Sequence, residues 1–192
     1  MPILLRNMFR VVTVLGAFLC LPQAVAASDE AWKIWQSDGV HALMRHAIAP
    51  GTGDPANFTL GDCTTQRNLD DTGRQQARET GDRIREMGIE LTSILTSQWC
   101  RCVDTARLLD LGPVTEEPAL NSFFRNRSTE AAQTAEIKAK LASLPGDEKL
   151  LLVTHQVNIT ALTDIFPRSG EIILFRMSDD GTELDVLSRL MP

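Results

Sequence analysis

Short apolar runs alternate with longer amphipathic segments along this sequence. Such runs are typical of β-strands, and they cover residues 40–45, 91–96, 114–115 and 150–154, with two closing strands at 171–177 and 183–189. Segments with apolar or small residues at helical spacing lie between them and predict helices over residues 70–87, 101–109, 130–144 and 158–165. Alternation of this kind predicts a three-layer α/β/α sandwich around a mostly parallel sheet.

Three segments add detail to this pattern. The run at 150–154 reads LLLVT, which is continuous in apolar residues as expected for a strand buried on both faces. Asp179-Asp180-Gly181 is a turn signal between the two closing strands and predicts a hairpin there. Residues 47–68 are rich in Gly, Pro, Thr and Asp without periodicity, so they form a long loop, and long loops in compact domains are usually functional.

The first 26 residues have the layout of a secretory signal peptide. Arg6 and Arg10 precede an apolar run over residues 11–21, and the small residues Ala24-Val25-Ala26 follow. The run is shorter than the roughly 20 residues that a membrane-spanning helix needs, although an uncleaved anchor remains the alternative. We expect cleavage after Ala26, a single mature domain over residues 27–192, no stable membrane anchor, and a periplasmic or secreted location.

Composition and charge narrow the class of partner. The chain has 192 residues, of which 43% are hydrophobic and 23% charged, as in a soluble globular protein of one domain. Its formal net charge is −6, and loss of the first 26 residues removes two arginines and no acid, giving −8. An acidic protein is a poor match for a phosphate backbone, so we expect no nucleic-acid partner. The sequence carries no signal for a particular oligomeric state.

Three cysteines remain after the expected cleavage: Cys63, Cys100 and Cys102. An odd number in an oxidising compartment predicts one disulfide and one free thiol. Cys63 with Cys100 is the preferred pair, and Cys63 with Cys102 is the alternative. In the preferred pairing Cys102 is a small buried apolar side chain. A Cys-x-Cys redox or zinc site is a further alternative, but it lacks a second pair of ligands.

Polar side chains gather at the ends of the predicted strands. Arg45 and His46 end the first strand, Arg101 follows the second, and His155 directly follows the LLLVT run. Because ligands bind beyond the carboxyl ends of strands in open α/β sheets, we expect these four residues to meet at one rim. Each of them alone has a structural explanation as a cap or a solvated charge. His41, the third histidine, has no role that the sequence assigns.

Two imidazoles and two guanidiniums suit the transfer of a phosphoryl group. A neutral imidazole can attack phosphorus and form a covalent intermediate. Guanidiniums can hold the charged phosphoryl oxygens bidentately, and a second imidazole, in its protonated form, adds another donor. No cluster of Asp, His or Cys has the spacing of a metal site. We therefore expect the positive charge to come from the protein itself, with no metal or other cofactor.

Four ordered segments resemble the motifs of the histidine phosphatase superfamily, whose members have the phosphoglycerate-mutase-like fold. Residues 43–47 (LMRHA) resemble its Arg-His-Gly signature, with Ala47 in the place of glycine. Residues 68–77 (NLDDTGRQQA) resemble its Leu-Thr-x-x-Gly-x-x-Gln-Ala helix start, and residues 96–106 (TSQWCRCVDTA) its Ser-x-x-x-Arg-x-x-x-Thr-Ala segment. Residues 152–155 (LVTH) resemble its second histidine after a buried strand. The sequence resembles a small exported bacterial member.

The resemblance implies a function as well as a fold. It implies that His46 is the nucleophile that becomes phosphohistidine, and that Arg45, Arg101 and His155 hold the phosphoryl group. The expected activity is metal-independent hydrolysis of a small-molecule phosphomonoester, and location alone suggests an envelope sugar phosphate. Two alternatives stay open: a weak or inactive phosphate- or phosphosugar-binding module of the same fold, and a phosphomutase. Export argues against the mutase and against a protein phosphohistidine phosphatase.

The sequence departs from the family pattern at the proton donor. Many members carry a glutamate in a Leu-x-Glu setting, where this chain has Leu120-Asn121-Ser122. Glu116, Glu117 and Asp62 are candidates to replace it, and each is equally explained as a surface charge. The missing acid favours the binding-module alternative. It also bears on the substrate, because a good leaving group needs no strong acid.

Overall fold

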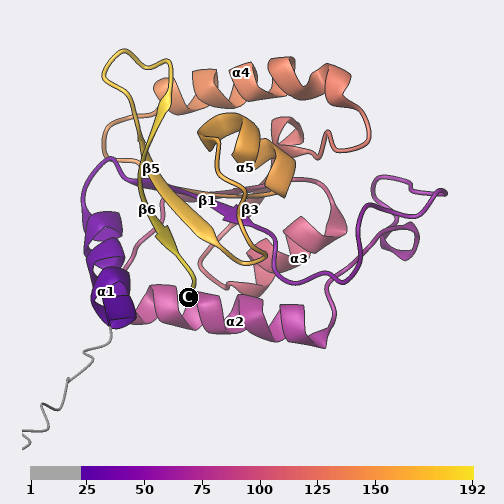
Figure 1. The fold of residues 1–192 in the computed structure, drawn as a ribbon, viewed down its shortest axis with the longest axis horizontal. Helices are drawn as coiled ribbons and strands as arrows, with labels where there is room; N and C mark the ends of the chain where they lie inside the picture. Colours follow the sequence, from indigo (N-terminus) through magenta and orange to yellow (C-terminus); the bar gives the residue numbers. More distant parts are fainter. Residues whose placement is uncertain (1–22) are drawn as a thin grey trace, which may run out of the picture.

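The computed structural model describes residues 23–192, which form a six-stranded sheet between two layers of helices (Figure 1). The strands are β1 (His41–Arg45), β2 (Ser93–Thr96), β3 (Val114–Glu116), β4 (Leu150–Thr154), β5 (Ile172–Met177) and β6 (Leu184–Leu190). The helices are α1 (Gln23–Gln36), α2 (Asp71–Glu86), α3 (Cys100–Leu108), α4 (Glu130–Ala142) and α5 (Gln156–Thr163), and the 3-10 helices are η1 (Cys63–Thr65), η2 (Pro118–Leu120) and η3 (Arg127–Thr129).

The sheet has the strand order β3-β2-β4-β1-β5-β6. The first four strands in this order are parallel, while β5 runs antiparallel to β1 and β6 antiparallel to β5. The prediction of an α/β sandwich with a mostly parallel sheet is therefore confirmed, and the closing hairpin is its antiparallel part.

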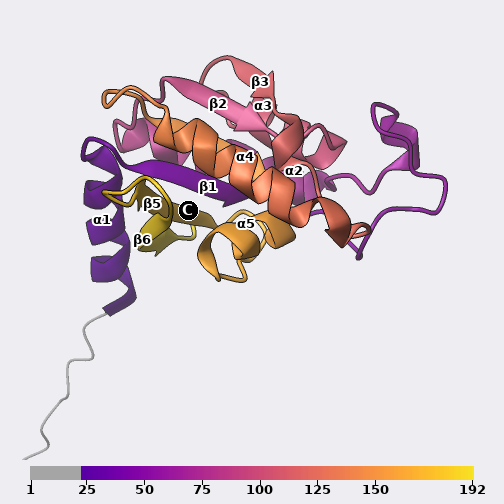
Figure 2. The same ribbon diagram turned by 90° about the horizontal axis from the view of Figure 1, so that it is seen from above.

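Side chains of β4 alternate between two hydrophobic cores. Leu150 and Leu152 belong to the core under α4 and α5, while Leu151 and Val153 belong to the core that α1, α2 and α3 cover. Both views of the ribbon show α4 on the opposite face of the sheet from α2 (Figures 1 and 2). A continuous apolar sequence follows from this placement, because successive strand residues point to opposite faces and both faces are buried.

The patterning of the sequence did not predict helix α1. Trp32 and Trp35 of this helix are 2% and 0% exposed, and their rings stack with centroids 5.8 Å apart. Lys149 caps the C-terminal end of the helix, since its Nζ donates to the carbonyl oxygens of Trp35 at 2.6 Å and Ser37 at 2.7 Å. Apolar residues at helical spacing on its buried face were the available signal.

The predicted signal peptide falls mostly outside the described residues, which begin at Gln23. Helix α1 also begins there, so helical structure runs through the expected cleavage point after Ala26. Within residues 23–192, no helix combines the length and the apolar character that crossing a bilayer requires.

Gly73 lies where α2 passes closely over the chain that follows β1. A Cβ atom at this position would be 1.9 Å from the carbonyl oxygen of Ile48, so only glycine fits. Asp70 caps the same turn, its carboxylate accepting from the amide of Gly73 at 2.7 Å. The start of α2 is thereby held against the segment directly after His46.

Gly73→Ala is expected to lower the free energy of unfolding by about 2 kcal/mol or more, because the clash is with backbone that cannot rotate away. Urea denaturation measures this difference. Gly146→Ala is the matched control, since Gly146 is exposed, has no positive φ and has no atom within 4 Å of its Cβ position. Equal free energies of unfolding for the two variants would show that the close approach of α2 is not required.

Candidate active site

The register of two central strands brings His46 and His155 together. Strands β1 and β4 are parallel neighbours with Arg45 opposite Thr154, and each histidine is the next residue in its chain segment. The two rings lie 5.6 Å apart with an angle of 68° between their planes. His46 is 2% exposed and His155 3%. The predicted meeting of the two histidines at one rim of the sheet is thus what the structure shows.

All four predicted site residues line one cavity of about 360 Å³. Arg45 ends β1, where its Nη1 donates to the carbonyl oxygen of Pro167 at 2.9 Å, and Arg101 lies in the first turn of α3 with 3% exposure. The Nε atoms of both arginines are buried and bond to no other described group. Because buried N–H donors without partners are rare in proteins, these two are suited to an anionic ligand.

The hydrogen bonding of His46 determines which of its nitrogens can react. Its Nδ1 lies 2.8 Å from the carbonyl oxygen of Ala47, and because a carbonyl only accepts, Nδ1 carries the proton. Its Nε2 therefore carries the lone pair. Burial, followed by the charge of Arg101, lowers the pKa of His46 well below 6.5, so the ring is neutral at neutral pH. A neutral imidazole with a free Nε2 is the form that can attack phosphorus.

His155 is fixed in the opposite tautomer. Nη2 of Arg101 lies 3.3 Å from its Nδ1, and since a guanidinium only donates, Nδ1 accepts. Nε2 then carries the proton and donates to Ser97 Oγ at 2.8 Å. Burial and the charge of Arg101 lower the pKa of His155 well below 6.5. The neutral ring is therefore favoured in the protein alone, whereas an anionic phosphoryl group beside the ring would raise its pKa and favour the expected protonated form.

Asp54 and Arg67 of the long loop add to the charged part of the cavity, as does Arg125, and the sequence did not single them out. Asp54 accepts from Arg101 Nη1 at 2.7 Å, from Trp99 Nε1 at 3.1 Å and from the amide of Arg67 at 3.1 Å. Burial alone would raise the pKa of Asp54, but the hydrogen bonds and charge of Arg101 outweigh it and lower the pKa. Arg67 lines the cavity and donates to the carbonyl oxygen of Gly53 at 2.8 Å.

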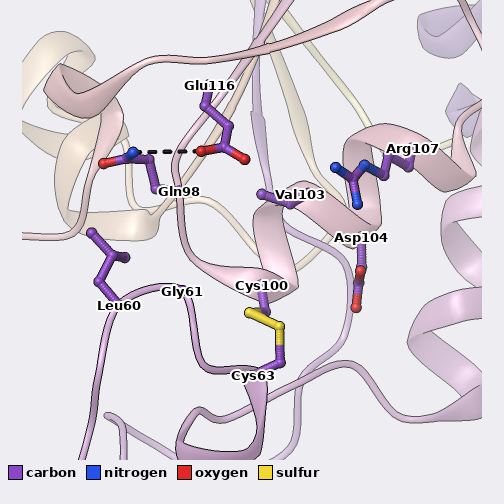
Figure 3. Close-up of a pocket in the computed structure, with 9 residues that line it drawn as sticks. All are labelled: Leu60, Gly61, Cys63, Gln98, Cys100, Val103, Asp104, Arg107 and Glu116. Carbon is purple, nitrogen blue, oxygen red and sulfur yellow. Dashed lines mark hydrogen bonds between the residues drawn. A yellow bond between two sulfur atoms is a disulfide. The ribbon is translucent and has the colours of Figure 1, made fainter.

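A disulfide joins the long loop to the helix that carries Arg101. Cys63 of η1 is bonded to Cys100, the first residue of α3, so the preferred pairing is confirmed (Figure 3). Cys102 is free and buried, and burial raises the pKa of its thiol to about 12. Because Cys100 is used in the disulfide, the Cys-x-Cys site is wrong. No group of three His, Cys, Asp or Glu side chains in the described part of the chain could hold a metal ion.

Comparison with protein families decides the classification. A model of the histidine phosphatase superfamily (branch 1) matches residues 42–142, which is more than half of the chain. The protein belongs to the histidine phosphatase superfamily. The matched region contains Arg45, His46 and Arg101, and it ends before His155.

Proteins similar to this chain include several phosphatases. The mitochondrial serine/threonine-protein phosphatase Pgam5 of Drosophila grimshawi is 38% identical over 65 residues, which are 34% of this chain and only 22% of that protein. The protein histidine phosphatase SixA in complex with tungstate has a TM-score of 0.57 at 16% identity, covering 80% of this chain and 97% of that one. Phosphoserine phosphatase from Entamoeba histolytica has a TM-score of 0.55 at 15% identity, covering 80% and 97%. At such identities the two solved structures show a shared fold.

In this superfamily member, none of the three predicted proton donors lines the cavity that holds His46. Glu116 lies in a separate hollow beside the disulfide, where it accepts from Gln98 Nε2 at 3.4 Å (Figure 3). Glu117 is paired with Lys140 at 2.7 Å, and Asp62 caps η1. Their contacts give all three carboxylates structural roles outside the cavity.

The position that matches the family glutamate does belong to the cavity. Ser122 is one of the lining residues. Asp54 contributes the only carboxylate among them, and both of its oxygens are held by Arg101, at 2.7 Å and 3.3 Å. A carboxylate with a lowered pKa in such a pair does not hold a proton at neutral pH. The cavity therefore contains no side-chain carboxylic acid that can protonate a leaving group.

His41 has a structural role that sequence reasoning did not find. Its Nδ1 accepts from the amide of Leu150 at 3.2 Å, and its ring packs against Phe175 with centroids 5.6 Å apart. Burial, followed by the charge of Lys149, lowers the pKa of His41. This histidine lies in the first position of β1, away from the cavity.

The pKa values of the histidines predict how stability depends on pH. His46 and His155 have folded-state pKa values well below the reference of 6.5, so below pH 6.5 the unfolded chain binds more protons than the folded one. The stability that the two neutral histidines contribute to the free energy of unfolding is fully present above pH 6.5. It is lost as the pH falls toward their folded-state pKa values. Each of the two contributes a slope of up to about 1.4 kcal/mol per pH unit. Urea denaturation at pH 7.5, 6.5, 5.5 and 4.5 measures it, and an unchanged free energy of unfolding would contradict it.

Proposed function

We propose that this protein is a metal-independent phosphatase that hydrolyses a phosphomonoester through a phosphohistidine on His46. The observation that carries the proposal is the fixed tautomer of His46, whose Nδ1 donates to Ala47 and whose Nε2 keeps its lone pair beside two arginine side chains in one cavity. A nucleophile and its phosphate-binding donors are thereby pre-organised before any substrate binds.

The first half of the reaction forms a covalent intermediate. The Nε–H groups of Arg45 and Arg101, which have no hydrogen-bond acceptor among the described residues, donate to the phosphoryl oxygens. Nε2 of His46 attacks phosphorus, the new N–P bond forms, and the bond from phosphorus to the ester oxygen breaks with its electron pair on that oxygen. The ring becomes cationic, and its Nδ1–H keeps its bond to the carbonyl of Ala47, which stabilises the positive charge.

The second half returns the enzyme to its starting form. A water molecule attacks phosphorus, the N–P bond breaks with its electron pair on Nε2 of His46, and inorganic phosphate leaves. His155 is the donor that responds to substrate, because the charge of the phosphoryl group raises its pKa against the effect of Arg101. Positive charge at the reaction centre comes from Arg45, Arg101 and the nearby Arg67, so no step needs a metal ion.

Three further observations support a phosphatase and its location. Pgam5 is named as a serine/threonine-protein phosphatase, and the solved structures of similar fold include phosphatases for phosphohistidine and phosphoserine. The Cys63–Cys100 disulfide fits an oxidising compartment outside the cytoplasm. We therefore assign a phosphatase that acts in the periplasm or outside the cell, and this location alone favours a small phosphorylated molecule as its substrate.

A panel of phosphomonoesters tests this function. Purified protein is expected to release inorganic phosphate from at least one of them, with the same kcat/KM in the presence and absence of EDTA. Vanadate, a phosphate analogue, is expected to inhibit competitively. If the protein binds vanadate but hydrolyses no ester, the phosphate-binding module is the correct function. If EDTA abolishes turnover and a metal restores it, metal independence is wrong.

A further inference from the structure

In the part of the chain that the structure describes, the Phe and Trp side chains are divided between the core and one cavity. The described residues include eight Phe and Trp residues, of which four are buried in the interior: Trp32, Trp35, Phe123 and Phe175. The other four all line the cavity that holds His46: Phe58, Trp99, Phe124 and Phe166. They come from different loops or from the start of α3, so no single element explains their meeting at one place.

The outer two of these aromatic residues are exposed to solvent. Phe166 is 70% exposed and Phe124 is 52% exposed, which makes them the most and the second most exposed phenylalanines of the described residues. Phe58 lies deeper and stacks on Trp99, with ring centroids 5.0 Å apart and 21° between the planes. Exposed apolar groups that gather at the rim of a functional cavity mark the place where an apolar part of a ligand binds.

Lack of a free acid in the same cavity restricts the leaving group. Asp54 is tied to Arg101 and is ionised, and Ser122 stands where the family glutamate is expected. The leaving oxygen must therefore depart without a proton from a carboxylic acid. A phenol, with a pKa of about 10, is far more acidic than an aliphatic alcohol, whose acidity is close to that of water, so a phenolate leaves far more readily.

We propose that the substrate is an aryl phosphomonoester, with its ring among Phe58, Phe124 and Phe166 and its phosphorus at Nε2 of His46. This proposal rests on the proposed phosphatase function. The P–O bond to the ring breaks with its electron pair on the phenolate oxygen, which then takes a proton from water. The cavity of about 360 Å³ is at the lower end of ligand sites, as suits one ring and one phosphoryl group.

A set of matched esters separates the leaving group from the ring. Phenyl phosphate and benzyl phosphate carry the same ring, but only the first releases a phenol, while glycerol phosphate has no ring. We expect kcat/KM for phenyl phosphate to exceed that for benzyl phosphate by about 100-fold or more, the scale of general acid catalysis that the missing carboxyl would supply. The kcat/KM for benzyl phosphate should exceed that for glycerol phosphate by about tenfold, because its ring contacts the aromatic side chains of the cavity.

Two variants test the aromatic rim. Phe124→Ala/Phe166→Ala is expected to raise KM for phenyl phosphate about tenfold and to leave KM for glycerol phosphate unchanged, because both side chains are exposed and their loss opens no core. Leu60→Ala is the matched control. Leu60 is also exposed, at 43%, but it lines the separate hollow beside the disulfide, so kcat and KM of this variant should equal those of the wild type.

Further outcomes separate this proposal from the function on which it rests. An aryl phosphate can come from a small aryl ester or from phosphotyrosine in a peptide. A tyrosine-phosphorylated peptide is therefore assayed beside phenyl phosphate, and the ester with the higher kcat/KM identifies the class of natural substrate. If benzyl and glycerol phosphates are hydrolysed within tenfold of phenyl phosphate and the double variant keeps its KM, the aryl preference is overturned while the phosphatase stands. If no ester is hydrolysed and His46 carries no phosphate, both proposals fail.

Discussion

His46→Ala is expected to lower kcat/KM for any phosphomonoester by at least about 10⁴-fold, because no other described group offers a neutral nitrogen lone pair to the cavity. His155 cannot replace it, since the Nδ1 lone pair of that ring is occupied by Arg101 and its Nε2 carries a proton. Steady-state release of phosphate from the best ester of the panel measures the loss.

His41→Asn is the matched control for this substitution. The side-chain oxygen of asparagine can take the place of Nδ1 as acceptor from the amide of Leu150, so the fold is kept while an imidazole is removed. We expect kcat/KM within about twofold of the wild type. Circular dichroism must show that His46→Ala is folded. A folded His46→Ala that keeps even a tenth of the wild-type kcat/KM would rule out His46 as the nucleophile.

Arg101→Ala is expected to lower kcat/KM by about 10³-fold and to lower the free energy of unfolding by about 3–5 kcal/mol. The kinetic loss follows because the guanidinium both reaches the cavity and holds His155 in its tautomer. The loss of stability follows because Arg101 and Asp54 are 3% and 6% exposed, so removal of the arginine leaves a buried carboxylate without its counter-charge.

A double variant separates these two effects. Asp54→Ala/Arg101→Ala removes both charges, so its free energy of unfolding should lie between those of the wild type and Arg101→Ala, while its kcat/KM stays as low as that of the single variant. Urea denaturation and steady-state kinetics on the same preparations give both values. A double variant that is no more stable than Arg101→Ala, or that regains activity, would contradict the assigned roles of this ion pair.

The sequence was sufficient to predict most of the sheet and the positions of the four site residues. The LLLVT run is typical of a central strand. Because parallel strands place their carboxyl ends at one edge of the sheet, the topology alone predicts that His46 and His155 lie close together. The disulfide was predictable because only three cysteines follow the expected cleavage point and two of them are one residue apart.

The loop contributions were not predictable, because they depend on contacts between segments far apart in the chain. Asp54 reaches Arg101 across 47 positions, and no local pattern distinguishes it from Asp62, which caps a 3-10 turn. Arg67 is the only basic residue between positions 47 and 68, which was the one available signal. Proximity in sequence to the family glutamate favours Glu116 and Glu117, whereas β3 and η2 direct them away from the cavity.

Mass spectrometry of the protein after rapid quenching with a phosphomonoester tests the proposed mechanism most directly. Quenching at alkaline pH preserves phosphohistidine, and peptide mapping locates the added phosphate. We expect phosphate on His46, lost on brief acid treatment, and absent from a His46→Ala sample handled in parallel. Turnover of the ester by the wild type without any phosphate on His46, or with phosphate on His155 instead, would contradict the covalent mechanism.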